Sequence, residues 1–305
     1  MRRRNPYNAD GRLRLDERAW WLLLNAIDNR RPDRGVDPGL RTERFRAPAA
    51  DALERLRATA GTPSPSRALC DLFWQRLPWG DLERALGPLH VVDIGCGAGD
   101  YARRFRDWSG GRVRRYVGVD AVERSEWRAV SAAHPFAAFR RAAAERIDEC
   151  LEAETNLIVS QSAIEHVGDE GACFDRIHAH AHARGRPLLQ LHAVPSAACL
   201  RLYLWHGYRQ YTPRTISSIT ARFADCSERA LVSLGGRRSN AVHWRWVTWP
   251  IFFRRAGDPR DRDPAAYRRD LEEAVAHDVA DPDGPPSFYV LMIGSNARLP
   301  AIVAT

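Results

Sequence analysis

The segment Asp93-Ile94-Gly95-Cys96-Gly97-Ala98-Gly99 places three glycines at alternate positions, directly after an apolar strand predicted over residues 89–94. A helix is predicted to begin at Asp100. Because glycine lacks a Cβ atom, it adopts positive φ angles readily and lets the backbone approach a bound ligand closely. The segment therefore predicts a turn that holds a cofactor at the N-terminus of a helix.

The spacing of these glycines distinguishes between two kinds of cofactor. A dinucleotide-binding turn needs G-x-G-x-x-G, and Asp100 stands where its third glycine should be. A pyrophosphate would also lie near the carboxylates of Asp93 and Asp100, and like charges in a partly dry site repel one another. A sulfonium ligand with a free amine fits this turn better.

A second acid, Asp120, ends the next predicted strand, Arg115-Tyr116-Val117-Gly118-Val119-Asp120. A carboxylate at the end of the second strand of a βαβ unit faces the ribose of a nucleoside held over the first turn. We therefore expect Asp120 to accept hydrogen bonds from both ribose hydroxyls.

Together with the segment Ser160-Gln161-Ser162-Ala163-Ile164-Glu165-His166-Val167, these motifs resemble those of the class I S-adenosylmethionine-dependent methyltransferases. In that family an acid precedes G-x-G-x-G, a second acid ends strand two, and strand four often runs into a Leu/Ile-Glu-His-Val segment. The resemblance covers about residues 87 to 250, with a last strand near 288–294. It implies S-adenosylmethionine as the cofactor and methyl transfer as the reaction.

The resemblance also implies a role for each matching residue. The glycines would line the methionine moiety, Asp93 would orient the turn and the ligand amine, and Cys96 would pack beneath the cofactor. The third motif departs from the family, because the acid expected after the strand at 136–140 is replaced by Arg141-Ala142-Ala143-Ala144-Glu145. Either Glu145 or a backbone carbonyl would then contact adenine. The expected cofactor-binding residues are Asp93, Gly95, Cys96, Gly97, Gly99, Asp120, Ala144, Glu145 and Ser160.

Two histidines are candidates for a catalytic base. Methyl transfer to a hydroxyl needs a group that removes the acceptor proton. His192 lies near the C-terminal end of the strand predicted over 188–194, and His166 follows the strand before it, at the edge where ligands bind in such sheets. The alternative for each is a structural histidine that hydrogen-bonds loop backbone.

Residues 200–213 are dense in aromatic side chains with polar ends. They either form the floor of an acceptor pocket or make a core cluster. In the first case the contacts with the acceptor would come from His206, Tyr208, Arg209 and Tyr211.

The order of predicted elements indicates a doubly wound α/β fold with a mostly parallel, seven-stranded sheet. Residues 1–86 are predicted to be a helical extension that either covers the site or completes the core. Residues 87–305 would form the methyltransferase domain, with strands over 188–194, 244–253 and 287–293. A polar segment at about 254–286, with one short helix, is expected to be a solvated excursion.

Composition limits the alternatives. All 46 basic residues are arginine, and they are mixed with 38 acids along the whole chain, so the net charge of +8 predicts no nucleic-acid face. The six cysteines form no C-x-x-C pair, and His178, His180 and His182 would bring only two ligands together on a helix, so no metal site is expected. No apolar run is long enough to span a bilayer, and no secretory signal is recognisable, which predicts a cytoplasmic protein.

The function that these features favour is methylation of a small molecule at a hydroxyl, such as that of a sugar or secondary metabolite. An RNA or protein methyltransferase is the enzymatic alternative, and arginines clustered around the cleft would favour it. A cofactor-binding scaffold subunit with a closed acceptor pocket is the alternative without catalysis.

Overall fold

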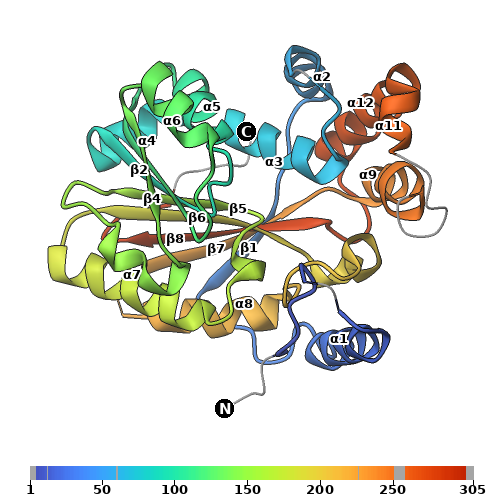
Figure 1. Cartoon of the computed structure of the whole chain (residues 1–305), viewed down its shortest axis with the longest axis horizontal. Coiled ribbons are helices and arrows are strands. Elements are labelled where there is room, and N and C mark those ends of the chain that lie inside the picture. Colours follow the sequence, from blue (N-terminus) through green and yellow to red (C-terminus); the bar gives the residue numbers. More distant parts are fainter. Residues whose placement is uncertain (1–4, 12, 60, 226, 251–257, 300–305) are drawn as a thin grey trace.

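The computed structural model describes residues 5–11, 13–59, 61–225, 227–250 and 258–299. Its centre is one sheet of eight strands in the order β1-β7-β8-β6-β5-β2-β3-β4 (Figure 1). Strand β8 is antiparallel to both β6 and β7, and the other neighbouring pairs are parallel. The mostly parallel, doubly wound α/β fold is therefore confirmed. The strands are β1 (Leu40–Arg44), β2 (Leu89–Ile94), β3 (Val113–Asp120), β4 (Ala137–Arg141), β5 (Leu157–Gln161), β6 (Leu188–Pro195), β7 (Ser227–Leu234) and β8 (Phe288–Ser295).

Helices cover both faces of this sheet, as Figure 1 shows. One apolar core joins the sheet to α2 (Ala49–Ala58), α3 (Pro65–Gln75), α4 (Trp79–Leu86), α5 (Asp100–Trp108) and α12 (Pro264–Ala280). A second core joins the opposite face to α7 (Glu170–Arg184) and α8 (Pro213–Thr220). The remaining helices of four or more residues are α1 (Leu15–Asp28), α6 (Glu126–Ala133), α9 (Arg237–His243) and α11 (Pro259–Arg262), with irregular helical turns at 144–149, 197–203 and 244–248. No helix of the described residues combines the length and apolar character needed to cross a bilayer.

The sheet has one strand more than the sequence predicts. Residues 40–44 lie within the extension that is predicted to be helical, whereas they form β1 and pair in parallel with β7, from Leu40 opposite Arg229 to Arg44 opposite Ser233. Three of the five β1 residues are charged and only Leu40 is buried. Such a strand lacks the apolar alternation that marks a half-buried strand, because it lies at the edge of the sheet.

The strand predicted over 244–253 is wrong. Residues 237–243 form α9, and 244–248 continue it as a π-helical turn, while 251–253 lie outside the described residues. The strand that occupies this place in the sheet is β7. A short apolar run does not by itself distinguish a strand from a helix that packs on a neighbour. Here the indole of Trp246 packs on Tyr267 and donates a 2.7 Å hydrogen bond to Asp270, both on α12.

The segment expected to be a solvated excursion instead contributes to the core. Helix α12 buries Tyr267, Leu271, Val275 and Val279, which recur every fourth residue and so share one face. The Tyr267 hydroxyl donates a 2.5 Å hydrogen bond to the carbonyl of Pro63, before α3. The N-terminal helices and α12 therefore pack together on one face of the sheet.

Candidate functional site

The glycine turn lies between the end of β2 and the start of α5. Gly95 and Gly99 have φ angles of +76° and +90°, and a Cβ atom built on each would lie 2.3 Å from the Cβ of Ala163 and 2.5 Å from the ring of Phe139. Gly97 also has a positive φ, yet a Cβ there would meet nothing within 4 Å among the described residues. The two outer glycines are therefore required by protein packing, whereas the space above Gly97 is open to a ligand.

A cavity of about 430 Å³ opens beside this turn. Its size lies within the range of small-ligand sites. Helix α3 supplies Arg67 and Asp71, α5 supplies Tyr101 and Arg104, and β5 supplies Gln161. Asp71 is buried, and its carboxylate accepts hydrogen bonds from the Tyr101 hydroxyl at 2.6 Å and from Arg104 at 2.8 Å. The guanidinium of Arg67 donates to the Tyr101 oxygen at 2.8 Å. Two guanidinium groups thus border the cavity and are held in place.

Asp93 forms part of the lining of the same cavity. Its carboxylate is almost completely buried and accepts a 2.5 Å hydrogen bond from the hydroxyl of Tyr116 on β3. Burial raises the pKa of Asp93 to about 7, against the lowering effect of the Tyr116 hydroxyl. A buried carboxylate with this pKa gains from a cationic neighbour, which favours its ionised form.

Asp120 ends β3 beside the turn. One carboxylate oxygen accepts a 3.0 Å hydrogen bond from the N–H of Gly97, and the other accepts a 2.9 Å hydrogen bond from the N–H of Val122. A carboxylate has about four acceptor positions, so two are left for ligand hydroxyls. The turn is supported further by Trp127, whose indole donates a 2.8 Å hydrogen bond to the carbonyl of Gly97 and stacks on Phe139.

The other residues expected at the cofactor lie as follows. Cys96 is largely buried against Gly118 of β3, and burial raises the pKa of its thiol. Ala144 begins a helical turn, and the carboxylate of Glu145 accepts a 3.1 Å hydrogen bond from the N–H of Asp169. Ser160 is fully buried, with its hydroxyl 2.9 Å from Nδ1 of His192. Ser160 thus has no surface to offer a cofactor, and the neighbouring Gln161 lines the cavity in its place.

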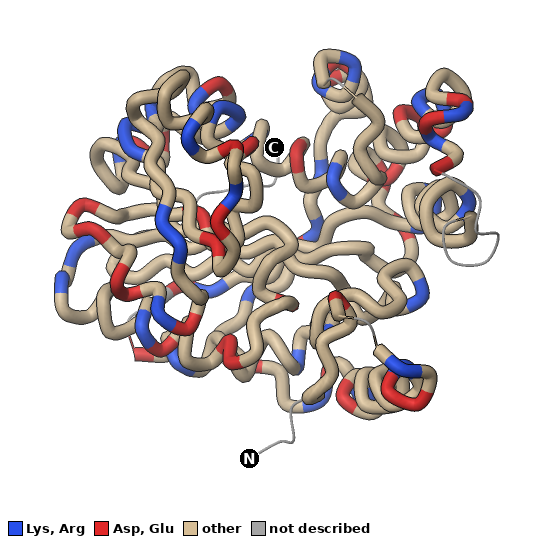
Figure 2. Tube along the Cα trace, in the orientation of Figure 1, with Lys and Arg blue, Asp and Glu red and all other residues tan. Residues whose placement is uncertain are grey.

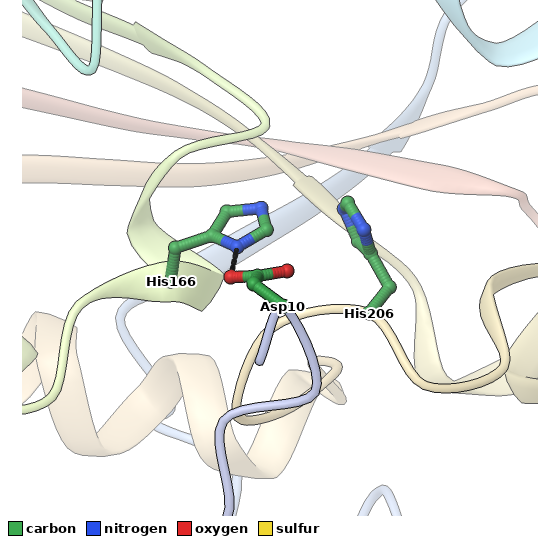
Figure 3. Close-up of side chains that lie close together, drawn as sticks. All are labelled: Asp10, His166 and His206. Atoms are coloured by element: carbon green, nitrogen blue, oxygen red, sulfur yellow. Dashed lines mark hydrogen bonds and ion pairs between the residues drawn. The ribbon is translucent and has the colours of Figure 1, made fainter. Parts of the chain in front are cut away.

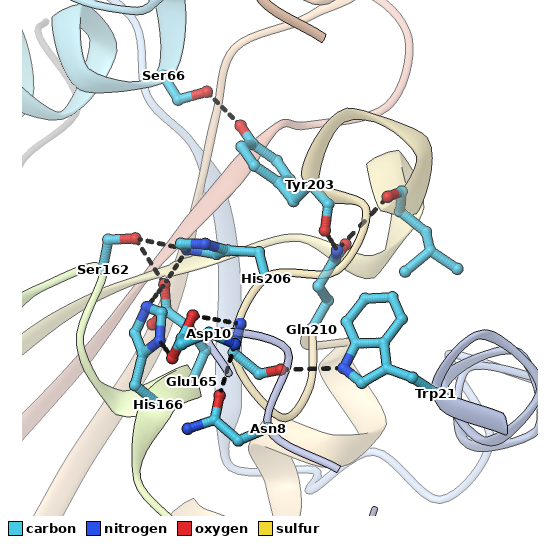
Figure 4. A network of polar contacts seen from close by, with 12 residues as sticks. Asn8, Asp10, Trp21, Ser66, Ser162, Glu165, His166, Tyr203, His206 and Gln210 are labelled. Atoms are coloured by element: carbon cyan, nitrogen blue, oxygen red, sulfur yellow. Dashed lines mark hydrogen bonds and ion pairs between the residues drawn. The ribbon is translucent and has the colours of Figure 1, made fainter. Parts of the chain in front are cut away.

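Four ionisable side chains gather at the carboxyl end of β5, and we call them the histidine cluster: Asp10, Glu165, His166 and His206 (Figure 3 and Figure 4). Nδ1 of His166 is paired with Oδ2 of Asp10. Oε1 of Glu165 lies 3.4 Å from Nε2 of His206 and 3.8 Å from Nε2 of His166. The two imidazole rings are nearly perpendicular, with centroids 4.5 Å apart. Three distant segments of the chain therefore meet here.

Charge within the cluster is unevenly compensated. Burial by itself lowers the pKa of His166, but the hydrogen bond to Asp10 and the charges of Glu165 and Asp10 outweigh it, so the pKa is raised. Burial of Asp10 acts to raise its pKa, and the hydrogen bond and charge of His166 outweigh this and lower it. Glu165 is fully buried. Its Oε1 accepts a 2.5 Å hydrogen bond from Ser162, but its Oε2 has no hydrogen-bond partner among the described residues.

His192, one of the two predicted bases, does not join the cluster. It lies on the face of β6 that α7 covers, with its ring against Phe174 and none of its surface exposed. Burial lowers its pKa to about 3. Its nitrogens face Ser160 and Gln190. A substrate hydroxyl cannot reach an imidazole in this position, so the structure supports the alternative of a structural histidine.

Of the four residues expected to contact the acceptor, only His206 belongs to the cluster. Arg209 and Tyr211 both bind the carboxylate of Glu170, at 2.8 and 2.5 Å, and Tyr211 is buried. Tyr208 is half-buried, with Arg209 over its ring. These three hold the 206–211 loop against the start of α7, so the predicted pocket floor is in large part a structural contact.

Several site residues were not predicted from the sequence. Asp10 comes from a segment without a motif, and it reaches the site because this segment crosses the 206–208 loop: Asn5 donates to the carbonyl of Tyr208, and Ala9 donates to that of Gly207. Arg67 and Asp71 lie on α3, within the extension that is predicted either to cover the site or to complete the core, but neither residue was itself predicted. Spacing four residues apart on one face of α3 was the available signal for that pair.

Comparison with known proteins agrees with this geometry. A family model described as "Methyltransferase domain" matches residues 40–225, which is more than half of the chain. The chain therefore belongs to this family and is an S-adenosylmethionine-dependent methyltransferase. No curated protein matches the sequence.

Solved structures of similar fold share little sequence with this chain. The plantazolicin methyltransferase BamL, solved with a triazolic desmethylPZN analogue and SAH, has 14% identity and a TM-score of 0.49, over 81% of this chain and 90% of that one. The [4+2]-cyclase SpnF has 12% identity and a TM-score of 0.45, over 84% and 99%. An S-adenosylmethionine-dependent methyltransferase from Mesorhizobium loti has 14% identity and a TM-score of 0.40, over 71% and 96%. Scores of this size add nothing to the assignment that the family model makes.

Proposed function

We propose that this enzyme transfers the methyl group of S-adenosylmethionine to a hydroxyl of a small molecule bound at the histidine cluster. The observation that carries the proposal is the pair of sites at the ends of β2 and β5. A glycine turn with a buried carboxylate lies on one side, and two imidazoles next to two carboxylates lie on the other. The two are adjacent, since Ala163, which packs on Gly95, lies between Ser162 and Glu165.

The residues around the turn fit the cofactor. The carboxylate of Asp93 would accept hydrogen bonds from the ammonium group of the methionine moiety, and Arg67 and Arg104 would attract the carboxylate of that moiety. Asp120 would bind the ribose hydroxyls through its two remaining acceptor positions. Val122, two residues after Asp120, is 53% exposed and would offer an apolar contact to adenine, beside the backbone near Ala144. When bound, the cofactor supplies an electrophilic methyl group.

At the cluster, the protein's part is to position the acceptor and take its proton. An in-line transfer depends on placing the oxygen close to the methyl group, and a hydroxyl must lose its proton as it reacts. His206 is the proposed base, because its side chain is 38% exposed and its Nε2 faces the carboxylate of Glu165, which would stabilise the imidazolium. His166, paired with Asp10, is the second candidate.

The charge distribution favours a small acceptor over a nucleic acid. Basic and acidic residues alternate along the helices and loops of Figure 2, and the chain has many local ion pairs. A cavity of about 990 Å³ is bordered by Arg30, Arg31, Arg34 and Arg214 and shares no residue with the cavity beside the turn.

Transfer of labelled methyl from S-adenosylmethionine into a cell extract supplemented with sugars and phenolic metabolites, followed by separation into small-molecule and macromolecular fractions, tests the proposal. We expect label in a small molecule. Label in RNA or protein would refute the small-molecule assignment. Tight S-adenosylhomocysteine binding with no transfer to any fraction would favour the scaffold alternative.

Replacing Asp120 by alanine should weaken S-adenosylhomocysteine binding about 5- to 150-fold, because hydrogen bonds to a charged group contribute about 1–3 kcal/mol. Titration calorimetry measures this. The matched control is Glu123→Ala, since Glu123 is an exposed acid three residues further on. Equal affinity of the two variants would contradict the ribose assignment.

Cofactor affinity should depend on pH through Asp93. Its pKa of about 7 means that the carboxylate takes up a proton below neutrality and loses its attraction for the ligand ammonium. The α-amino group itself loses its proton above about pH 8. We therefore expect affinity to be highest between these values and to fall up to tenfold per pH unit on the acid side. Calorimetry from pH 5.5 to 8.5 checks this, and Asp93→Asn should abolish the acid limb; an acid limb that persists in this variant rules Asp93 out.

A further inference from the structure

We propose that Asp10, His166 and His206 form a binding site for one divalent transition-metal ion of the zinc class, with Glu165 next to it. The inference rests on the proposed function for the position of the acceptor. It changes how the acceptor is activated when the ion is bound.

The ligand geometry is the first support. One side-chain atom each of Asp10, His166 and His206 lies within 4.8 Å of the other two, and among the described residues no other set of three or more such side chains meets this condition. Figure 3 shows the two rings and the carboxylate turned toward a common space. Zinc binds imidazole nitrogen and carboxylate oxygen at about 2.0–2.2 Å, so its ligand atoms lie about 3–4 Å apart. Small side-chain movements would bring these atoms to that distance.

Glu165 supplies an independent observation. It has no exposed surface, and its Oε2 has no hydrogen-bond partner in the described part of the chain. With neutral imidazoles, the cluster carries the two negative charges of Asp10 and Glu165. A buried carboxylate is costly unless it is paired with a cation. A divalent ion would balance both charges.

The surroundings orient the proposed ligands. The N–H of Gly207 donates a 3.2 Å hydrogen bond to Oδ1 of Asp10, and Ser162 donates to Glu165, which faces Nε2 of both histidines. Hydrogen bonds of this kind commonly fix metal ligands.

The backbone next to the proposed ligands is strained as well: Ser162 and Trp205 have φ angles of +53°. A Cβ on Gly207 would lie 2.6 Å from the carbonyl oxygen of Glu165. Strain of this kind concentrates at functional sites.

The types of ligand atom indicate which metal ion this site would bind. Two imidazoles and one carboxylate suit zinc and its neighbours, whereas magnesium and calcium prefer oxygen ligands alone. Three protein ligands leave an open position, as in catalytic zinc sites. The acceptor hydroxyl would bind there as a Lewis base, and the ion would lower its pKa so that its proton passes to solvent water as the oxygen attacks the methyl group. The C–O bond forms, the C–S bond breaks, and the sulfur leaves with the electron pair as neutral S-adenosylhomocysteine.

Calorimetric titration of the chelator-treated full chain with Zn²⁺ alone tests the site. We expect one equivalent to bind, Mg²⁺ to bind far more weakly, and both Asp10→Asn and His206→Ala to weaken Zn²⁺ binding at least 100-fold. Asp10→Asn retains an oxygen that accepts from Gly207, so its fold should persist, and thermal unfolding checks this. His178→Ala is the matched control, because His178 also pairs with an aspartate, Asp225, but on the surface of α7. Absence of binding, or equal binding by all three variants, would overturn the proposal.

A spectroscopic readout keeps this inference separate from the proposed function. Co²⁺ in the site should give visible ligand-field bands that Asp10→Asn and His206→Ala remove. Metal-dependent bands without methyl transfer to any hydroxyl would uphold the site and refute the proposed function. An unchanged rate of transfer after complete removal of metal would refute the role of the ion in activation.

Discussion

Replacement of His206 by alanine is expected to lower the turnover number about 10²- to 10⁴-fold, the usual contribution of a general acid or base. The expected cause is the loss of the imidazole that lies 3.4 Å from Glu165 and 38% exposed. Affinity for S-adenosylhomocysteine should stay within twofold of the parent enzyme, because His206 does not line the cavity beside the glycine turn. Rates of label transfer and calorimetry measure the two effects.

His192→Ala is the informative comparison. It removes a buried ring that contacts Phe174 and leaves the hydroxyl of Ser160 without this partner. Loss of such a hydrogen bond costs about 1–3 kcal/mol, and the cavity adds to it. We therefore expect a lower melting temperature, with turnover of the folded fraction close to that of the parent. If His192→Ala reduced turnover as strongly as His206→Ala without loss of stability, the assignment of the base to the cluster would be wrong.

The second large effect is expected from the glycine turn. Gly95→Ala should abolish measurable cofactor binding and also destabilise the fold. Its Cβ would lie 2.3 Å from that of Ala163, at a φ of +76°, so either the turn or the segment that carries the histidine cluster must move. Overpacking of this kind costs about 1–3 kcal/mol, and the left-handed conformation about 1–2 kcal/mol more. Thermal unfolding and calorimetry with S-adenosylhomocysteine give the two quantities.

Gly97→Ala separates ligand contact from protein packing. Its Cβ meets nothing within 4 Å among the described residues, so the variant should lose only the stability that a left-handed φ costs an alanine. The added methyl group would occupy the space proposed for the cofactor. We expect a folded protein that binds S-adenosylhomocysteine at least tenfold more weakly. Gly35→Ala is the control for the conformational cost, because it has a φ of +71° and open surroundings far along the chain from the turn. If Gly97→Ala bound S-adenosylhomocysteine as tightly as the parent enzyme, the proposed position of the cofactor at the turn would be wrong.

The central part of the fold was predictable because its signals are local. Strands β2, β3, β5, β6 and β8 are short apolar runs, and each is bounded by turn residues or by the start of a helix. Such runs are typical of central strands that are covered on both faces of the sheet. The same reasoning failed at β1, whose charged residues lie at the sheet edge, and at 244–248, which forms a helical turn whose Trp246 packs on α12. The local preference of a segment for strand or helix is overridden where packing against a neighbouring element decides which of its side chains are buried.

The sequence by itself determined the turn at 93–99, the acid at 120 and the Glu165-His166 pair, because each depends on residues that are neighbours along the chain. The tertiary structure decided which histidine is available. His166 follows β5 and His192 lies near the carboxyl end of the neighbouring β6, yet α7 covers His192. It also decided that Asp10 meets residues 166 and 206, since no local pattern links an N-terminal segment to a loop almost 200 residues away. Such contacts arise from the packing of whole elements, which short-range spacing does not encode.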